Sequence, residues 1–564
     1  MSVLAHFEEY QKARVKFVQA VAEAATRPQN IEVMSNAGVM QLLRPLLLDN
    51  VPSIQQTAAL ALGRLANYSE DLAEAIVGNE ILPQLVYSLS EQNRFYKKAA
   101  AFVLRAVAKH SPDLAQAVVD SNALETLVPC LEEFDPTVKE AAAWAIGYIA
   151  QHTPGLAQHV VDAGSVPLLV LCIQEPEITL KRISASSMGD ICKHSPELAQ
   201  SVVDAGAVAY LAPLIIHPDA KLKRQVCGAL SHIAKHSVDL AEVVVEAEIF
   251  PNILNCLKDS DVMVRKNAAM CIREVAKHTP ELAKLIVNSG GAAALVDYVS
   301  EAQGNNKLPG IMALGYISAF SETLALAAIV SKGIAPLKDA LVTEPEDHIK
   351  AACAWTLGQI GRHTPDHARA LAEGDVLRHL LACMVHQESS EDLKTKSKRA
   401  LKAILAKCTH LQALQPLLRD SPVKVQKYVL RQFAQLLPHD VEARRAFVQV
   451  RCTTMNTMIE MLGTCFLLPC SPAMSHSLSI FPSIRRAAAC SSSKSSTKRW
   501  AANYPSLSCK LTTATHQKLS STTVRTTPRR CCRRSTSISL ALKNGVDWGQ
   551  SLLFVILLTR KPGG

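Results

Sequence analysis

A histidine followed by serine or threonine returns along this chain at a fixed interval of 42 residues. The pairs begin at five positions: His110, His152, His194, His236 and His278. Tyr68-Ser69 lies one period before this series, Phe320-Ser321 lies one period after it, and His363-Thr364 follows 43 residues later. A constant period of this length is the sequence signature of a repeat architecture, in which every unit is one supersecondary element.

A second series marks a turn in each period and keeps the same interval: Gly38, Glu80, Asn122, Gly164, Gly206, Glu248 and Gly290. Glycine occupies four of the seven positions, so the residue type is kept less strictly than in the first series. Two series with one period predict internal repetition over residues 31–410.

The period that begins at Ser195 predicts three helices. Ser195 can cap the first helix, Pro196 fits the first helical position, and Glu197 places negative charge at the positive helix end. Gly206 follows, where a left-handed backbone is least strained. Two further helices are expected, a middle one over residues 208–216 and a longer one over residues 220–235.

Such a unit cannot bury its apolar faces alone, so neighbouring units must stack into an all-α solenoid. An amphipathic N-terminal helix is expected to cap the first unit with these side chains: Phe7, Tyr10, Phe17, Val18 and Val21. The sequence predicts a capping helix over residues 1–30, about eight to nine repeats over 31–410, a final helical repeat or cap over 411–449, and an irregular tail over 450–564.

The pattern ELAQSVVDAGAVAYL at residues 197–211, together with Ala142-Ala143-Trp144-Ala145-Ile146, resembles the armadillo repeat. Segments such as Asn93-Arg94-Phe95-Tyr96-Lys97-Lys98 are similar to the axonemal, central-apparatus members of that family, over residues 1–449. The resemblance implies a right-handed solenoid and a non-enzymatic, protein-binding scaffold that supports the central apparatus and ciliary or flagellar motility. It also implies a location in the cytoplasm, cytoskeleton and axoneme, with central-apparatus proteins and microtubules as direct or indirect partners.

Charge divides the chain into two parts, although the whole carries a formal charge of +10. Residues 451–564 hold 16 Lys and Arg against only Glu460 and Asp547, whereas residues 1–450 hold 44 basic and 48 acidic side chains. A basic surface is typical of proteins that bind nucleic acid or anionic membrane. The near-neutral repeats predict neither partner and are consistent with protein binding.

The tail after residue 449 loses the period, and two interpretations of it remain open. One is a disordered basic segment that binds anions or tubulin. The other is an aberrant segment: residues 450–486 would be translated intron, 487–540 would be family sequence read out of frame, and the rest would lie past the normal stop. Synonymous codons for residues 513–518 can be read in another frame as family-like sequence. That interpretation assigns no function to the tail charge.

Cysteine usage and hydropathy predict a soluble intracellular chain without metal or cofactor. Nine cysteines occur singly in the repeats and no CxxC pair is present, which favours a reducing compartment. Residues 1–14 lack a signal-peptide pattern, and the apolar run at 552–558 is too short to span a bilayer.

The candidate functional residues fall in one column of the third helices, one residue per repeat: Arg64, Ala106, Tyr148, Asp190, His232, Glu274, Tyr316 and Gln359. Asp190, His232 and Glu274 have the residue types of acid–base catalysis. Stacked helices lie about 10 Å apart, however, which is too far for a hydrogen-bonded pair. The sequence also lacks a phosphate-binding loop, a zinc-protease motif and a nucleophile elbow, so no enzyme and no small-molecule substrate are expected.

In armadillo folds this column and the residues one turn earlier line a concave groove that holds extended peptides. The resemblance therefore implies partner contacts at Trp144, Tyr148, Asp190, His232, Glu274, Tyr316, Trp355 and Gln359. Either tryptophan could equally pack between repeats. Nuclear-import adaptors hold basic peptides with Trp and, four residues on, Asn, whereas Tyr148 and Gln359 stand at those places here. Two alternatives remain: a soluble transport adaptor of that type, or a microtubule- or nucleic-acid-binding protein that acts through its basic tail.

Overall fold

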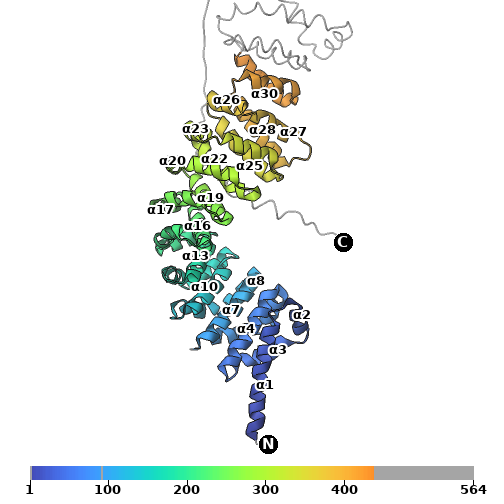
Figure 1. The fold of residues 1–564 in the computed structure, drawn as a ribbon, viewed down its shortest axis with the longest axis vertical. Helices are drawn as coiled ribbons and strands as arrows, with labels where there is room; N and C mark the ends of the chain where they lie inside the picture. Colours follow the sequence, from blue (N-terminus) through green and yellow to red (C-terminus); the bar gives the residue numbers. More distant parts are fainter. Residues whose placement is uncertain (1–2, 91–92, 437–564) are drawn as a thin grey trace, which may run out of the picture. The chain divides into compact units, whose positions relative to one another are not determined.

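The computed structural model describes residues 3–90 and 93–436, and every regular element in these two stretches is a helix (Figure 1). The chain divides into two compact units, Met1–Cys470 and Ser471–Gly564, and all described residues belong to the first. The prediction of an all-α fold is therefore confirmed for this part of the chain.

Helices recur in threes, in the order short, middle and long. The short helices are α2 (Pro28–Asn36), α5 (Glu70–Gly78), α8 (Pro112–Asp120), α11 (Pro154–Asp162), α14 (Pro196–Asp204), α17 (Val238–Glu246), α20 (Pro280–Asn288), α23 (Glu322–Val330) and α26 (Pro365–Glu373). The middle helices are α3 (Val39–Leu43), α6 (Leu82–Leu89), α9 (Ala123–Leu127), α12 (Ser165–Cys172), α15 (Ala207–Leu211), α18 (Phe250–Cys256), α21 (Gly291–Glu301), α24 (Ile334–Thr343) and α27 (Val376–Val385). The long helices are α4 (Pro52–Tyr68), α7 (Arg94–Ala108), α10 (Pro136–Ala150), α13 (Ile178–Cys192), α16 (Ala220–Ala234), α19 (Val262–Ala276), α22 (Leu308–Phe320), α25 (Asp347–Gly361) and α28 (Glu391–Leu405).

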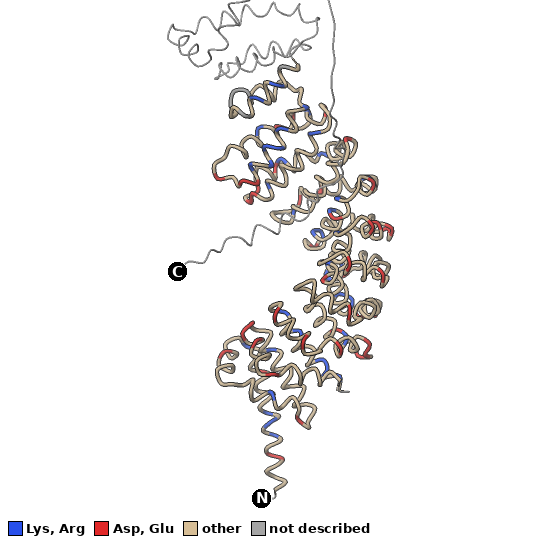
Figure 2. Tube along the Cα trace, turned by 180° about the vertical axis from the view of Figure 1, so that it is seen from behind, with Lys and Arg blue, Asp and Glu red and all other residues tan. Residues whose placement is uncertain are grey.

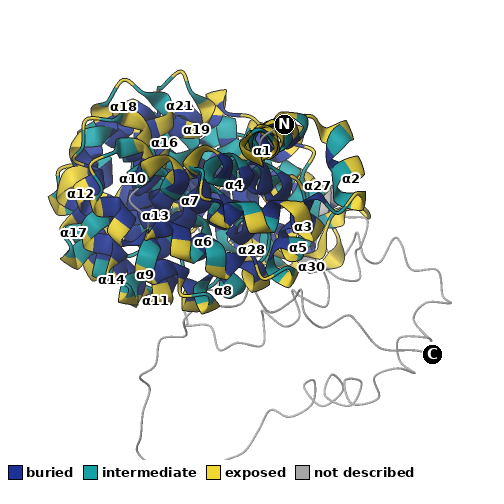
Figure 3. Cartoon of the chain, turned by 90° about the horizontal axis from the view of Figure 1, so that it is seen from below, coloured by how far each residue is buried: buried dark blue, intermediate teal, exposed yellow. Residues whose placement is uncertain are grey.

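The core of the solenoid follows the long helices, each of which packs against the long helices of the repeats before and after it. In each of the first eight repeats, one equivalent apolar position of the long helix is fully buried: Leu62, Leu104, Ile146, Met188, Leu230, Ile272, Leu314 and Leu357. Figure 3 shows buried residues gathered on α7 and α13, whereas α12 and α14 carry more exposed ones. Burying each such side chain contributes about 1.5–3 kcal/mol, and the contribution is repeated along the stack.

The period at Ser195 forms its helices largely as predicted. The Leu198 backbone N–H donates to Ser195 Oγ at 3.3 Å, which is the expected cap of α14. The middle helix differs from the prediction, because it ends as α15 at Leu211 and continues as the 3-10 helix η3 (Ala212–Ile216). Pro213 lacks the N–H that an α-helix would need at that place, which explains the change. The other 3-10 helices are η1 (Arg44–Leu48), η2 (Pro129–Glu132) and η4 (Gly304–Lys307).

The positions of the turn series share one backbone conformation although their residue types differ. All seven predicted positions have positive φ, from +51° at Glu80 to +85° at Gly290. Lys332 and Asp375 extend the series with φ of +63° and +59°. A left-handed backbone costs about 1–2 kcal/mol for a residue with a side chain. The fold therefore imposes this turn even where the sequence does not offer glycine.

A series of lysine–carboxylate ion pairs connects neighbouring repeats. Lys97 Nζ lies 2.5 Å from Glu133 Oε1, and Lys139 Nζ lies 2.6 Å from Glu175 Oε1. Lys223 pairs with Asp259 in the same way. Each lysine is on a long helix, and each carboxylate precedes the long helix of the next repeat. These half-buried pairs fix the spacing of consecutive units.

The two ends of the described solenoid are helical. The first helix, α1 (Val3–Ala24), buries Val18 and Val21, but Phe7 and Tyr10 are 57% and 59% exposed. The expectation that all five apolar residues of this helix cover the first unit is thus met only by its second half. At the other end, α29 (Leu411–Asp420) and α30 (Val423–Leu436) follow α28, with Val429 and Phe433 buried.

The predictions for residues 450–564, both the basic-tail and the out-of-frame interpretation, lie outside the described residues, as does the apolar run at 552–558. Within residues 3–90 and 93–436, no individual helix combines the length and apolarity needed to cross a bilayer. Three bent helix pairs meet the criterion jointly, by length and composition alone: α11 with α12, α14 with α15 and η3, and α20 with α21.

Candidate functional site

The first aromatic cluster predicted for the groove lies on α10. Trp144 and Tyr148 are one helical turn apart, and their rings stack with centroids 5.5 Å apart and planes 16° from parallel. Both side chains are half-buried, so each presents one part to the core and another to the surface. Stacking of this kind is worth about 0.5–1.5 kcal/mol beyond the area that it buries.

Arg105 of α7 completes this cluster and was not among the predicted residues. Its Cζ lies 5.0 Å from the Trp144 ring centroid, 5.3 Å from that of Phe102 and 5.9 Å from that of Tyr148. A guanidinium over several aromatic faces is held by their negative quadrupoles. Burial lowers the pKa of Arg105 below its ordinary value, although a guanidinium remains charged. Its Nε is buried and makes no hydrogen bond within the part of the chain that the structure describes.

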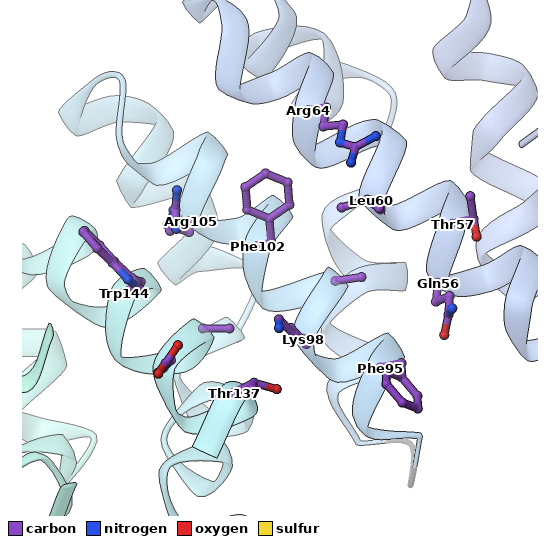
Figure 4. A pocket seen from close by; sticks show the side chains of 13 residues that line it. Gln56, Thr57, Leu60, Arg64, Phe95, Lys98, Phe102, Arg105, Thr137 and Trp144 are labelled. Carbon is purple, nitrogen blue, oxygen red and sulfur yellow. The ribbon is translucent and has the colours of Figure 1, made fainter. Parts of the chain in front are cut away.

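A cavity of about 560 Å³ opens beside this cluster and runs across α4, α7 and α10 (Figure 4). Figure 4 shows Phe102 and Arg105 between Leu60 of α4 and Trp144 of α10. Arg64 and Lys98 add two more cations to its lining, and Glu140 adds one carboxylate. The groove is therefore apolar at its floor and predominantly basic.

The central residues of the column do not assemble into one catalytic group. Asp190 Oδ1 pairs with Lys193 Nζ at 2.7 Å, just past the end of α13. His232 Nδ1 lies 2.9 Å from the carbonyl oxygen of Gly189, and burial lowers the pKa of this imidazole. Asp190 thus bonds within its own repeat, whereas His232 bonds the backbone of the preceding repeat.

Glu274 is the most buried of the predicted residues, with 5% of its surface exposed. Burial favours the neutral form of this carboxyl, but attraction to Arg273 and Lys277 outweighs burial and holds the pKa of Glu274 below its ordinary value. Lys277 Nζ lies 2.6 Å from Glu274 Oε2, and Arg273 bonds Oε1. The charge of Glu274 is thus neutralised within α19 and its flanking residue.

The second aromatic cluster joins two repeats. The rings of Tyr316 on α22 and Trp355 on α25 meet edge to face, with centroids 5.2 Å apart and planes 68° from parallel. Gly315 makes this possible, because a Cβ at that position would lie 2.1 Å from Trp355 Cζ3. Burial raises the pKa of Tyr316. One turn after Trp355, Gln359 Oε1 is buried and accepts no hydrogen bond from the described residues.

A second cavity, of about 290 Å³, lies between α28 and α30 and was not predicted. Lys394, Lys398 and Lys402 line it, together with Glu391. Lys402 Nζ lies 5.8 Å from the Tyr428 ring centroid. The sequence did not predict this cavity, because the column of third-helix positions was followed only as far as Gln359.

Residues 3–90 and 93–436 contain no group of three or more His, Cys, Asp and Glu side chains that could hold a metal ion. Nine cysteines in this part of the chain are free thiols, and eight of them are buried. Burial raises the pKa of the Cys271 thiol to about 12, so it behaves as a small core side chain and not as a nucleophile.

Comparison with known proteins identifies the repeat. The Armadillo/beta-catenin-like repeat family matches residues 27–67, 111–151 and 195–235, and the HEAT repeat family matches residues 249–279. Each armadillo match covers one short, one middle and one long helix. A crystal structure of an engineered protein superposes with a TM-score of 0.64 over 71% of this chain and 98% of that one, at 24% identity, and shows the same fold.

Two curated relatives extend the comparison over most of the chain. Sperm-associated antigen 6 of Mus musculus and that of Homo sapiens are each 74% identical to it over 446 residues, which is 79% of this chain and 88% of each relative. Armadillo repeats and this likeness together identify a protein-binding scaffold. The chain therefore belongs to the armadillo-repeat family of sperm-associated antigen 6.

Proposed function

We propose that this chain is a non-enzymatic scaffold of the motile axoneme, where it supports the structure of the central apparatus and the beating of cilia and flagella. The observation that carries the proposal is the 74% identity over 446 residues to sperm-associated antigen 6, whose name associates it with sperm. Its partners are other central-apparatus proteins and microtubules, reached directly or through another protein.

The groove along the long helices is the surface that we assign to these partners. Aromatic side chains are common anchors of protein interfaces because they bury a large area with few rotatable bonds. The two clusters that contain Trp144 and Trp355 are the anchors, and the polar members of the column line the groove between them. The proposed contacts are Trp144, Tyr148, Asp190, His232, Glu274, Tyr316, Trp355 and Gln359.

A nuclear-import adaptor is disfavoured by the first cluster. Such an adaptor must receive Lys or Arg side chains of its cargo on the faces of groove tryptophans. Here Arg105 already lies 5.0 Å from the Trp144 ring centroid, so a second cation would meet like charge. The missing asparagine column, with Tyr148 and Gln359 in its place, points in the same direction.

The decisive experiment expresses the tagged full-length chain in a multiciliated cell, beside a version that ends at residue 449, and images both against axonemal markers. We expect both to concentrate at the centre of the axoneme, because under this proposal the repeats are sufficient for targeting. Nuclear signal for both would favour the adaptor. Axonemal signal for the full chain alone would favour binding through the basic tail, and diffuse signal for both would contradict the proposal.

A further inference from the structure

The cations of the groove across α4, α7 and α10 are not neutralised by the protein itself. Arg105 has no ion pair with any described residue, and its Nε makes no hydrogen bond there. Lys98 is exposed and makes no close ion pair in the described ranges, although its charge also acts on Asp135. Arg64 uses one of its donors on the carbonyl oxygen of Ala22, which is not charged. Three positively charged side chains therefore line one cavity, and each has N–H donors that remain free to bind a ligand.

The single carboxylate of this cavity does not offset them. Glu140 accepts a hydrogen bond from Thr179 of the next repeat, and it forms no ion pair with any of the three cations. Nearby acids are already used: Glu133 pairs with Lys97, and Asp135 pairs with Arg94 at 3.4 Å. Figure 2 shows both basic and acidic residues along the described trace, and a second group of basic residues lines the other cavity, between α28 and α30.

The aromatic floor adds a second requirement for the ligand. Phe102 and Trp144 are half-buried and line the cavity beside Leu60, and Phe95 at its edge is 57% exposed. Apolar surface of this kind is stabilised when an apolar side chain of a partner covers it. A ligand made of charge alone would leave that surface in contact with water.

We propose that this groove binds an extended acidic segment of a partner protein, one that carries an aromatic or aliphatic side chain among its carboxylates. The inference rests on the proposed role of the groove as a partner-binding surface and names the chemistry of the partner. Carboxylates bond the guanidinium groups of Arg105 and Arg64 in a bidentate geometry and meet the ammonium group of Lys98. The apolar side chain of the segment covers Phe102 and Trp144.

The dimensions of the groove fix the length of the segment. Three long helices span about 20 Å at the usual spacing of about 10 Å. An extended chain rises about 3.3 Å per residue, so about six residues cross the groove. The chain's own residues 451–564 are an unsuitable occupant, because they contain 16 basic residues and only two acidic ones. The segment must therefore come from another molecule.

Fluorescence anisotropy with the purified full-length chain tests the inference. The probe is a fluorescein-labelled octapeptide of six glutamates and two phenylalanines, compared with peptides in which glutamine or lysine replaces every glutamate. We expect the acidic peptide to bind at least about tenfold more tightly than the glutamine peptide, and Arg105→Gln to weaken it at least about tenfold. Lys98→Gln should weaken it less, because that exposed side chain is better hydrated. Added salt should weaken the acidic peptide most.

Two variants serve as controls. Arg378→Gln removes an exposed arginine of α27 outside the groove and should leave the affinity unchanged. Lys402→Gln alters the second basic cavity, beside α28, and should also have little effect. Circular dichroism melts of all variants establish that they are folded, and the exposed Lys98 keeps the test valid if Arg105→Gln unfolds the chain.

The inference is overturned if the three peptides bind alike, if the lysine peptide binds best, or if Lys402→Gln reduces affinity where Arg105→Gln does not. Binding of phosphatidylserine vesicles without binding of the acidic peptide would identify a lipid headgroup as the ligand instead. Axonemal localisation of Arg105→Gln in a multiciliated cell separates the two proposals. A chain that still localises but binds no acidic peptide keeps the scaffold function and loses this inference.

Discussion

His194 Nε2 lies 2.7 Å from the carbonyl oxygen of Ala150, the last residue of α10 in the preceding repeat. The other members of the series make the same contact with the repeat before them: His110, His152, His236, His278 and His363. The last carbonyl groups of a helix have no partner inside it. Each histidine therefore caps a helix of the preceding repeat. This hydrogen bond explains why histidine recurs with the period of the repeats.

Replacing His194 by alanine should remove the bond and leave the Ala150 carbonyl without its partner. We expect the free energy of unfolding to fall by about 1–2 kcal/mol, the usual effect of losing a hydrogen bond to a buried group. His159→Ala is the matched control, because His159 is exposed on α11 and its side chain makes no hydrogen bond to a described residue. Urea denaturation followed by circular dichroism measures both variants. Equal stability of the two would contradict a capping role.

Acid should weaken the solenoid through four histidines of this series and through His232 of the column. Burial lowers the pKa of five imidazoles below the ordinary value of 6.5: His194, His232, His236, His278 and His363. These groups stay neutral in the folded chain at a pH where the unfolded chain already binds protons. The free energy of unfolding therefore falls as the pH drops below 6.5.

The measurement is the urea midpoint of the full chain between about pH 7.5 and about pH 5.5, a window above the titration of ordinary carboxyl groups. The Arg224 guanidinium holds the pKa of Asp261 at about 2, so that group does not interfere. A double variant, His194→Gln with His236→Gln, should show a shallower dependence than the unaltered chain. A midpoint that rises on acidification would reverse the sign and refute the explanation.

The turn series predicts opposite effects for two substitutions. Gly206 has φ of +77° and open space where a Cβ would stand, so Gly206→Ala should cost about 1 kcal/mol through the backbone alone. Glu248 has φ of +53° and is exposed, so Glu248→Gly should stabilise the chain by up to about 1 kcal/mol. Thermal melts of both variants give the comparison. The same sign for both would show that side-chain contacts, and not φ, control this turn.

The aromatic clusters give a prediction for partner binding. Tyr148→Ala and Tyr316→Ala should each weaken capture of axonemal partners by about tenfold, the usual effect of truncating an interface anchor. Both residues are half-buried, so a fold check by circular dichroism accompanies the assay. Tyr210→Ala on α15 is the control, since this exposed tyrosine lies outside the column. Unchanged capture by both groove variants would remove the groove from the proposed function.

The sequence predicted what depends on neighbours within one period. Ser195 caps α14, and Gly206 turns the chain, because each acts on backbone groups a few residues away. The change from α-helix to 3-10 helix at Pro213 was not predicted, although its cause is equally local. The apolar run over residues 208–216 predicts one continuous helix and takes no account of the missing N–H of Pro213. The helical fold could thus be predicted almost completely.

The site was less predictable because its contacts cross between repeats. Arg105 stands one residue before the column position Ala106 and gains its role from Trp144 and Tyr148 of the next repeat. The pairing of Tyr316 with Trp355 likewise depends on the missing side chain of Gly315. A column of equivalent helix positions does not show which side chains of two neighbouring helices are in contact.

The histidine bond also sets a rule for how such a chain can change in length. A unit that carries the histidine supplies a donor for the unit before it and a carbonyl for the unit after it, so a whole copy of such a unit inserted in phase completes the bonds on both of its sides. Growth or loss by entire units therefore leaves the stack intact. A smaller insertion must be absorbed within one unit, as is the single additional residue between Ser318 and His363, where the bond spans 45 residues and not 44. Duplication of the period is thus the least disruptive way for this architecture to acquire a longer binding surface.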